Sequence, residues 1–275
     1  MTHWIKFSRA NDHLATIDAV ISRFLDMKPY RLVREYDPQP PFEVNRKYVR
    51  CVVRLSAPLT PPAELALLVG DCLSNFRASL DHLVYAIALK YTRRTEIVEQ
   101  KFLQFPIYDD GKKFGDWRGR VVKANLLSAD VLRDLETCQP YQGWDGKKGT
   151  LERHLAQKSM WVLNALINAD KHRTITPVTQ IRISNLRFGA TIPGEGALAG
   201  FTMTGTFKDG DQIGPAFNFQ PDTANAEVSL NADTEPDVAF GDEWPARGRP
   251  VGKLLHEFQE RIRDDIFAHF EMYLK

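Results

Sequence analysis

The sequence predicts an α+β fold in which a bundle of long helices packs with an antiparallel β-sheet. Two long apolar segments within about 61–174 have helical spacing, and β-branched runs broken by turn residues fill 30–56 and 175–240. An amphipathic segment over 251–274 closes the chain. Because each group of strands has one apolar face that needs cover, we expect the two groups to join and residues 1–275 to form a single domain.

Composition narrows the classes of protein that fit. A chain of 275 residues with 43% hydrophobic residues can bury a sizeable core, and its 36 basic and 35 acidic residues nearly cancel, which argues against a nucleic-acid coat protein. The first residues lack the apolar core of a signal peptide, and no stretch approaches the roughly 18 apolar residues of a membrane span. We therefore expect a cytoplasmic protein with no membrane partner.

The first elements are a helix and a pair of strands. A helix is predicted over residues 9–27, and two strands joined by a proline-rich link follow it. The helix has the apolar residues Leu14, Ile17, Val20, Ile21, Phe24 and Leu25. Alternation in the second strand predicts an apolar face with Val49, Cys51, Val53 and Leu55 and a basic face with Arg46, Tyr48, Arg50 and Arg54.

Longer helices follow. The most apolar one is predicted from Pro61 to Tyr91, because proline suits the first turn of a helix. Shorter helical stretches come after "QFPIYDD", the stretch "QPYQGWDGKKG" is predicted as a loop, and a second long helix is predicted over about 150–174. The closing helix has an apolar stripe of Leu254, Leu255, Phe258, Ile262, Ile266, Phe267 and Phe270.

Each of the two long helices contains a seam of polar residues. At about 100° per residue, Asp71, Asn75 and His82 fall within roughly 40° of one another. Arg77 and Asp81 are spaced as an i,i+4 ion pair beside that face. The second helix has a seam made of Asn164, Asn168 and Lys171, with His172 adjacent and Asp170 and Arg173 at its end.

Two interpretations of the seams remain open. If they face each other, they form a convergent polar pocket. In its low dielectric the pKa of a histidine can be shifted, and a positioned cation interacts more strongly with an anion. Alternatively, they form a satisfied hydrogen-bond network that fixes the helix register. A metal site made of Asp71, His82, Asp170 and His172 would lack the carboxylate-rich pattern of di-iron bundles, and the three cysteines show no CxxC spacing. We predict no metal and no other cofactor.

The stretch "RASLDH" resembles the R-x4-6-H motif of the HEPN superfamily of helical ribonucleases and nucleotide binders. Three matches occur, Arg77 to His82, Arg249 to His256 and Arg263 to His269, so the spacing alone does not choose among them. The first is preferred because it lies in the most apolar helix. The pair Arg263 and His269 is the second candidate. The stretches "NFRASLDHL" and "LNALINADKHR" together also resemble a widespread set of bacterial proteins of uncharacterised activity.

This resemblance implies a metal-independent endoribonuclease of a bacterial toxin or defence type that acts as a homodimer. RNA carries its own nucleophile, the 2′-hydroxyl. A protein therefore needs only a base that takes its proton and a cation that stabilises the charge on the phosphate. In this prediction His82 is the general base, Arg77 holds the phosphoryl oxygens, and Asn75 or Asp81 orients them. The binding residues are Asp71, Asn164, Asn168, Asp170, Lys171, His172 and Arg173. Local basic charge is predicted to attract RNA at Lys112, Lys113, Arg118, Arg120, Lys147 and Lys148.

The alternative is a protein without catalysis. The seam pocket, or the basic strand face with Arg46, Arg50 and Arg54, would then bind a nucleotide or another anion, since arginine forks suit phosphate. A purely structural role for the seams is the remaining possibility.

Overall fold

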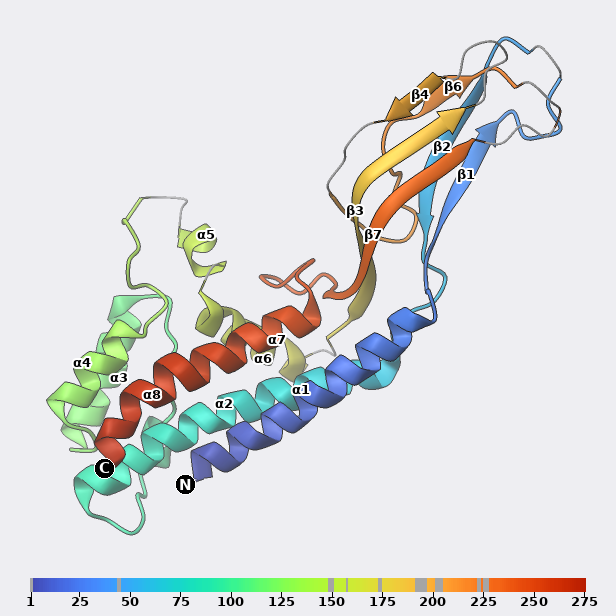
Figure 1. Ribbon diagram of the computed structural model, residues 1–275. Helices are drawn as coiled ribbons and strands as arrows, with labels where there is room; N and C mark the ends of the chain where they lie inside the picture. Colours follow the sequence, from blue (N-terminus) through green and yellow to red (C-terminus); the bar gives the residue numbers. More distant parts are fainter. Residues whose placement is uncertain are drawn as a thin grey trace. The chain divides into compact units, whose positions relative to one another are not determined.

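The computed structural model describes residues 2–43, 46–147, 151–156, 158–172, 175–190, 197–200, 205–221, 224 and 228–275 (Figure 1). The chain forms two compact units. The helical unit comprises Met1–Ala19, Ala63–Thr176 and Phe240–Lys275, and the sheet unit comprises Val20–Pro62 and Pro177–Ala239. The predicted α+β class is confirmed. The predicted helical and sheet regions correspond closely to these two units.

The sheet unit contains two antiparallel sheets. In the first, β2 lies between β1 and β6, and in the second, β3 pairs with β4, β5 and β7. The strands are β1 (Arg31–Asp37), β2 (Val49–Ser56), β3 (Pro177–Ala190), β4 (Ala197–Gly200), β5 (Gly205–Phe207), β6 (Phe217–Phe219) and β7 (Ser229–Phe240). The pairing of Cys51 with Phe217 confirms that the N-terminal strand pair joins the later strands.

The two sheets share one apolar core. The predicted alternation in β2 is confirmed, because Val49, Cys51, Val53 and Leu55 are all buried while Tyr48 is exposed. They pack in one cluster with Phe42, Ile181, Phe207, Ile213, Phe219 and Val228. The sheets therefore cover each other's apolar faces, which gives this unit a core of its own.

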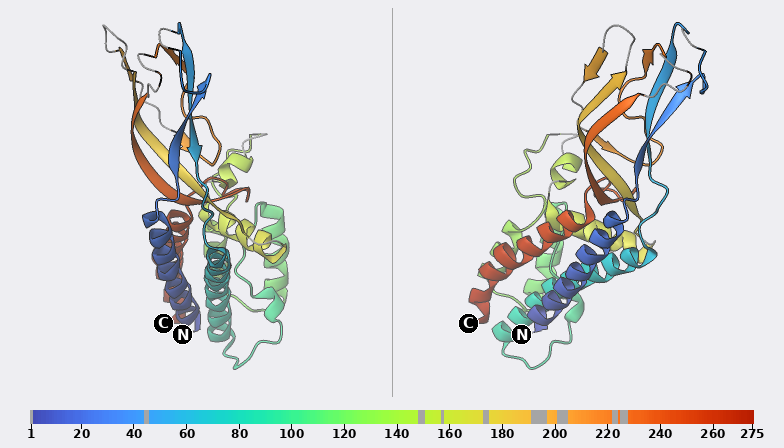
Figure 2. Two further views of the ribbon diagram at one scale, coloured as in Figure 1. Left: turned by 90° about the vertical axis from the view of Figure 1, so that its right-hand side faces the viewer. Right: turned by 45° about the vertical axis from the view of Figure 1, so that its right-hand side comes forward.

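The helical unit is built on three long elements that lie side by side in Figures 1 and 2. They are α1 (Thr2–Asp26) as far as Ala19, α2 (Ala63–Thr92) and the C-terminal helix. Phe7 of α1 joins them, since its ring contacts Phe76 of α2 and Phe267 of the C-terminal helix. The start of α1 is earlier than residue 9, where the sequence predicted it. The buried side chains of His3 and Phe7 explain the extension, because they continue the apolar face by one and a half turns.

The remaining helices are shorter. They are η1 (Gln100–Phe102), α3 (Gly111–Lys123), α4 (Ala129–Thr137), α5 (Leu151–Ala156) and α6 (Ser159–His172). The side chains of Asp110 and Ser128 cap α3 and α4 by accepting hydrogen bonds from the amides of Lys112 and Val131. The predicted short helices after "QFPIYDD" are thus confirmed.

The single long helix predicted over 150–174 is wrong, because α5 ends at Ala156 and α6 begins at Ser159. The amide of Lys158 instead closes a turn on the carbonyl of Leu155 at 2.9 Å. The buried residues Leu155 and Met160 are five positions apart, which would place them about 140° apart on one continuous helix. A break lets both side chains be buried.

The C-terminal helical segment runs through α7 (Val251–Glu260), the π-helical segment η2 (Arg261–Phe267), α8 (Ala268–Phe270) and η3 (Glu271–Leu274). All seven residues of the predicted apolar stripe are buried. Leu254, Phe258, Ile262, Ile266 and Phe270 repeat every four residues, so on an α-helix the stripe would drift by about 40° at each step. The wider turn of the π-helix offsets this drift.

Candidate functional site

The two polar seams lie on neighbouring, antiparallel helices. At one level of the pair, a Cβ atom on Gly70 of α2 would lie 2.8 Å from Oδ2 of Asp170 on α6. At another level, Arg77 of α2 and Asn164 of α6 line the same pocket. The structure therefore brings part of each seam together.

Arg77 and Asp81 bind a single stretch of backbone outside the helix. The Nη2 group of Arg77 donates to the carbonyl oxygen of Phe105 at 2.8 Å, and Oδ1 of Asp81 accepts from the amide of Phe105 at 2.8 Å. Nη2 of Arg77 also lies 3.1 Å from Oδ1 of Asp81. The predicted i,i+4 ion pair is present, and it positions the segment that follows η1.

The Arg77 pocket, as we name it, has a volume of about 230 Å³. Arg77, Lys101 and Arg120 contribute three positive charges, and no acidic residue is among the described residues that line it. The other lining residues are Phe102, Gln104, Phe105, Pro106, Ile107, Tyr108, Trp117 and Asn164. A concave site with this charge favours an anion.

Arg77 is the most enclosed cation of this pocket. Its side chain is only 17% exposed, and its Nη1 group is buried with no hydrogen-bond partner in the described structure. Burial raises the pKa of Asp81, while the charge of Arg77 opposes that rise. A buried guanidinium nitrogen without a partner is uncommon, because such a group normally finds an acceptor.

Polar side chains hold the wall of the pocket from behind. Nε2 of Gln139 donates to the carbonyl oxygens of Pro106 and Leu135 at 3.0 and 2.8 Å, and its Oε1 accepts from the amide of Tyr108 at 3.0 Å. The indole of Trp117 donates to the carbonyl oxygen of Phe102 at 2.9 Å. Segment 102–108 therefore has a fixed path although most of it is not part of a helix or strand.

His82 is not among the described residues that line the Arg77 pocket. Five positions on a helix turn a side chain by about 140°, so His82 leaves α2 in a different direction from Arg77. His82 is half-buried and interacts electrostatically with His3, which is fully buried in α1. The structure thus separates the two residues of the preferred R-x4-6-H match within one chain.

The other seam residues do not converge on one pocket. The side-chain amide of Asn75 donates to the carbonyl oxygen of Asp71 within α2 at 2.8 Å. Burial and the nearby Asp71 carboxylate raise the pKa of Asp170. The remaining members that are described are exposed, namely Asp71, Asn168, Lys171 and His172. Arg173 lies outside the described residues.

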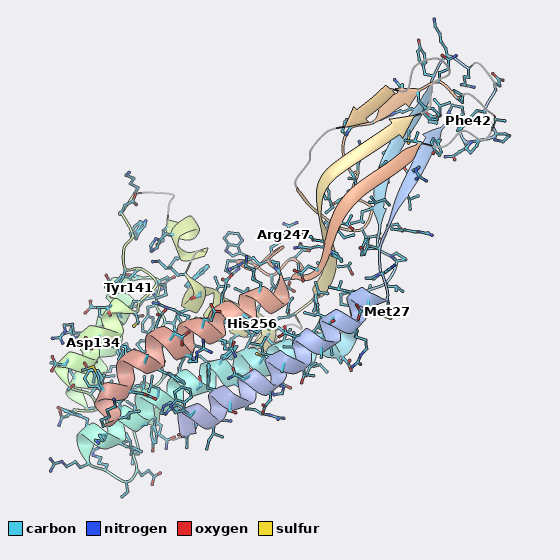
Figure 3. The ribbon with its side chains drawn as sticks, viewed as in Figure 1. Met27, Phe42, Asp134, Tyr141, Arg247 and His256 are labelled. Carbon is cyan, nitrogen blue, oxygen red and sulfur yellow. The ribbon has the colours of Figure 1, made fainter. Side chains whose placement is uncertain are left out.

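Arg263 and His269, the second candidate pair, bind different partners. Arg263 forms an ion pair with the adjacent Asp264 at 2.6 Å. Nε2 of His269 lies 2.8 Å from Oδ2 of Asp134 on α4, which also accepts a hydrogen bond from the Tyr273 hydroxyl at 2.6 Å (Figure 3 labels Asp134). Burial, together with this carboxylate, raises the pKa of Tyr273 to about 12.

Acidic residues partly neutralise the basic face of β2. Nε of Arg54 lies 2.7 Å from Oε2 of Glu35. Arg46 lies 4.0 Å from Glu43, and Arg50 is opposite Asp37 in the register of β1 and β2. This face is therefore a weaker anion site than its arginines suggested.

The sequence analysis found Arg77 and Asn164 but gave no role to Lys101 or Gln139. Arg120 was counted only as local charge. It lies three positions after the buried Trp117, so the helical period placed it beside the apolar face of α3. Nothing in the sequence marked Gln139, because its three partners lie in other segments or within its own turn.

Within the ranges that the structure describes, no three His, Cys, Asp or Glu side chains come close enough to hold a metal ion. No helix in the same ranges combines the length and apolar character that crossing a bilayer requires.

Comparisons of the chain with protein-family models, with curated proteins and with solved structures found no match. The resemblance to the HEPN superfamily therefore stays a prediction, and the argument for function depends on the pocket itself.

Proposed function

We propose that this protein binds a phosphate group of a nucleotide in the Arg77 pocket without catalysis. The observation that carries the proposal is the lining of this pocket, where Arg77, Lys101 and Arg120 are three cations and the described lining residues include no acid. A phosphate oxygen is an acceptor that guanidinium and ammonium groups bind strongly.

The size of the pocket limits how much of the ligand it holds. Sites that enclose a drug-sized molecule have volumes of about 300–1,000 Å³, and the Arg77 pocket has about 230 Å³. It therefore suits the phosphate of a nucleotide, while the nucleoside lies largely outside. The exposed Lys101 and Arg120 would meet the ligand first, and Arg77 would bind it deepest.

Isothermal titration calorimetry with AMP, adenosine and inorganic phosphate tests the proposal. AMP and phosphate should bind, and adenosine should not. Arg120→Gln should weaken AMP binding about 10-fold, which is the size expected when one charge-assisted hydrogen bond is lost. Lys123→Gln is the matched control, because Lys123 is exposed on the same helix and is not among the lining residues. Equal affinities for the two variants would refute the proposal.

Ribonuclease activity is the second candidate, because a guanidinium in a cationic pocket is also what a phosphodiester requires. Its base, His82, does not line that pocket in one chain, so this activity would need a second copy of the chain to supply a group for proton transfer.

A further inference from the structure

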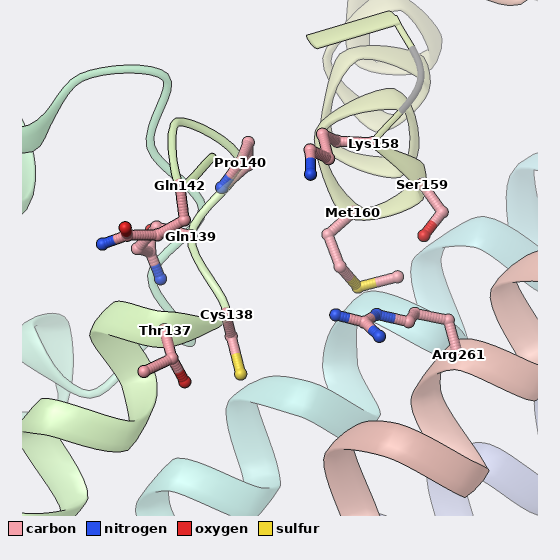
Figure 4. Close-up of a pocket in the computed structure, with 9 residues that line it drawn as sticks. All are labelled: Thr137, Cys138, Gln139, Pro140, Gln142, Lys158, Ser159, Met160 and Arg261. Carbon is pink, nitrogen blue, oxygen red and sulfur yellow. The ribbon is translucent and has the colours of Figure 1, made fainter. Parts of the chain in front are cut away.

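A second polar pocket lies elsewhere in the helical unit, between the loop after α4 and the start of α6 (Figure 4). We name it the Arg261 pocket. Its volume is about 320 Å³, and it is lined by Thr137–Gln139, Pro140, Gln142, Lys158–Met160 and Arg261. The proposed phosphate site does not use any of these side chains to contact its ligand.

The two walls of this pocket differ in charge. Lys158, Ser159, Met160 and Arg261 lie on one side in Figure 4, and the residues of the loop after α4 lie on the other. The first wall contains two cations. The ammonium group of Lys158 has no hydrogen bond or ion pair among the described residues. Arg261 pairs through Nη1 with Asp265, which leaves the rest of its guanidinium fork for another acceptor.

The opposite wall is neutral and polar. The hydroxyl of Thr137 donates to the carbonyl oxygen of Asp134 at 2.7 Å and can still accept a hydrogen bond. The amide of Gln142 can donate and accept, and the thiol of Cys138 also lines this wall. The amide of Gln139 is already engaged with backbone groups. A ligand that fits both walls has an anionic group at one end and hydroxyl groups at the other.

We propose that the Arg261 pocket binds a small hydroxylated phosphate ester of the sugar-phosphate class. Its phosphate contacts Lys158 and Arg261, and its hydroxyl groups contact Gln142 and Thr137. The volume lies at the lower end of the range for small-molecule sites, which suits a ligand of this size.

Cys138 provides a readout that belongs to this pocket alone. Cys51 and Cys72 are fully buried, so iodoacetamide should react with Cys138 first in the folded protein. Burial raises the pKa of Cys138, so the reaction should be followed at about pH 8.5, where a thiolate fraction is present. Mass spectrometry of the Cys138 peptide then gives the alkylation rate with and without ligand.

Ribose 5-phosphate is the probe, with ribose and inorganic phosphate as comparisons. We expect ribose 5-phosphate to slow alkylation of Cys138 at least 5-fold at saturation, ribose to have no effect, and phosphate to require a much higher concentration. The ligand class is refuted if phosphate protects as well as ribose 5-phosphate at equal concentration. The site itself is refuted if ribose 5-phosphate gives no protection of the parent protein.

Variants identify the residues that bind. Lys158→Ala and Arg261→Gln should each raise the concentration of ribose 5-phosphate needed for half-protection about 10-fold. Each is compared with its own unprotected rate, because Arg261 also acts on the Cys138 thiol. Lys253→Ala, at an exposed position of α7, is the matched control and should leave protection unchanged. Arg120→Gln should leave protection unchanged, and a loss of protection there would assign the effect to the Arg77 pocket and refute this proposal.

Discussion

Oδ1 of Asp81 accepts a hydrogen bond from the backbone amide of Phe105 at 2.8 Å. A charged side chain of α2 thus holds a segment that forms neither a helix nor a strand, and we call this attachment the anchor. Arg77 completes this anchor by binding the carbonyl oxygen of the same residue. The first prediction follows from this arrangement.

Replacing Asp81 should strongly destabilise the protein. Asp81→Ala leaves the Phe105 amide without an acceptor and Arg77 without its counter-charge, which corresponds to a loss of about 3–5 kcal/mol in the free energy of unfolding. Asp81→Asn keeps an acceptor oxygen and should cost about 1–3 kcal/mol. Urea unfolding followed by circular dichroism measures both. Asp71→Ala, at an exposed position of the same helix, should change stability by less than about 0.5 kcal/mol. Equal effects of Asp81→Ala and Asp71→Ala would contradict the anchor.

His3 should make stability depend on pH. Its ring is 0% exposed, and neither ring nitrogen has a hydrogen-bond partner in the described structure. Burial lowers the pKa of His3 below its ordinary value of 6.5, an effect that His82 reinforces and Glu271 opposes. Below about pH 6.5 the unfolded chain therefore binds a proton that the folded chain does not, so stability falls as the pH decreases.

The change amounts to about 1.4 kcal/mol for each unit by which the pKa of His3 is lowered. His3→Phe keeps an aromatic ring in contact with Phe267 and has no proton to bind, so its stability should vary less between pH 7 and pH 5. Thermal unfolding across that range measures the slope. Identical slopes for the parent and His3→Phe would show that His3 does not cause the dependence.

Gly70 of α2 lies close to the side chain of Asp170 on α6. An added Cβ atom would lie 2.8 Å from Oδ2 and 3.0 Å from Oδ1 of Asp170, so this carboxylate must turn away in Gly70→Ala. That rearrangement should offset part of the roughly 1 kcal/mol that alanine gains over glycine in a helix. Gly119→Ala is the matched control, because nothing lies within 4 Å of its added atom and alanine favours a helix by about 1 kcal/mol. The double variant Gly70→Ala with Asp170→Ala should recover stability. Equal stabilisation by Gly70→Ala and Gly119→Ala would contradict the contact with Asp170.

The ribonuclease prediction is tested by incubating the protein with RNA in EDTA and analysing the products for 2′,3′-cyclic phosphate ends. If His82 is the general base, His82→Ala should lower the rate at least about 100-fold. Arg77→Lys keeps a charge near Asp81 and is compared with Arg77→Ala, because the latter also disturbs the anchor. Cleavage that survives in both His82→Ala and Arg77→Ala, or that needs added metal, would contradict this prediction. Loss only in His269→Ala would move the site to the C-terminal helix.

The fold was largely predictable where local pattern decides it. The alternation of Val49, Cys51, Val53 and Leu55 and the helical spacing from Pro61 onward depend only on nearby residues, and both predictions are confirmed. The break between α5 and α6 was missed, because each half separately has a good helical period. The separation of the strands into two sheets that share a core was also missed, since the sequence does not say whether a strand's apolar face is covered by a helix or by another sheet.

The candidate site was predictable only in part. Arg77 was prominent because a charge within an apolar helix needs a partner. Its partner in space, the backbone of Phe105, has no signature in the sequence, since every residue has an amide and a carbonyl group. Gln139 illustrates the same limit, because its side-chain amide binds the backbone of Tyr108 and of Pro106, which lie 31 and 33 positions before it in the chain.

The hydrogen bonds on segment 102–108 have a consequence for the kinetics of amide exchange with heavy water. The amides of Phe105 and Tyr108 donate to Asp81 and Gln139, so they should exchange slowly, as amides inside α2 do, although neither lies in a regular element. The protection of Phe105 should follow that of α2, which contains Asp81, and the protection of Tyr108 should follow that of the end of α4, which leads into Gln139. Outside its helices and strands, this chain thus contains a stretch of backbone whose amide exchange is controlled by side chains from two different helical segments.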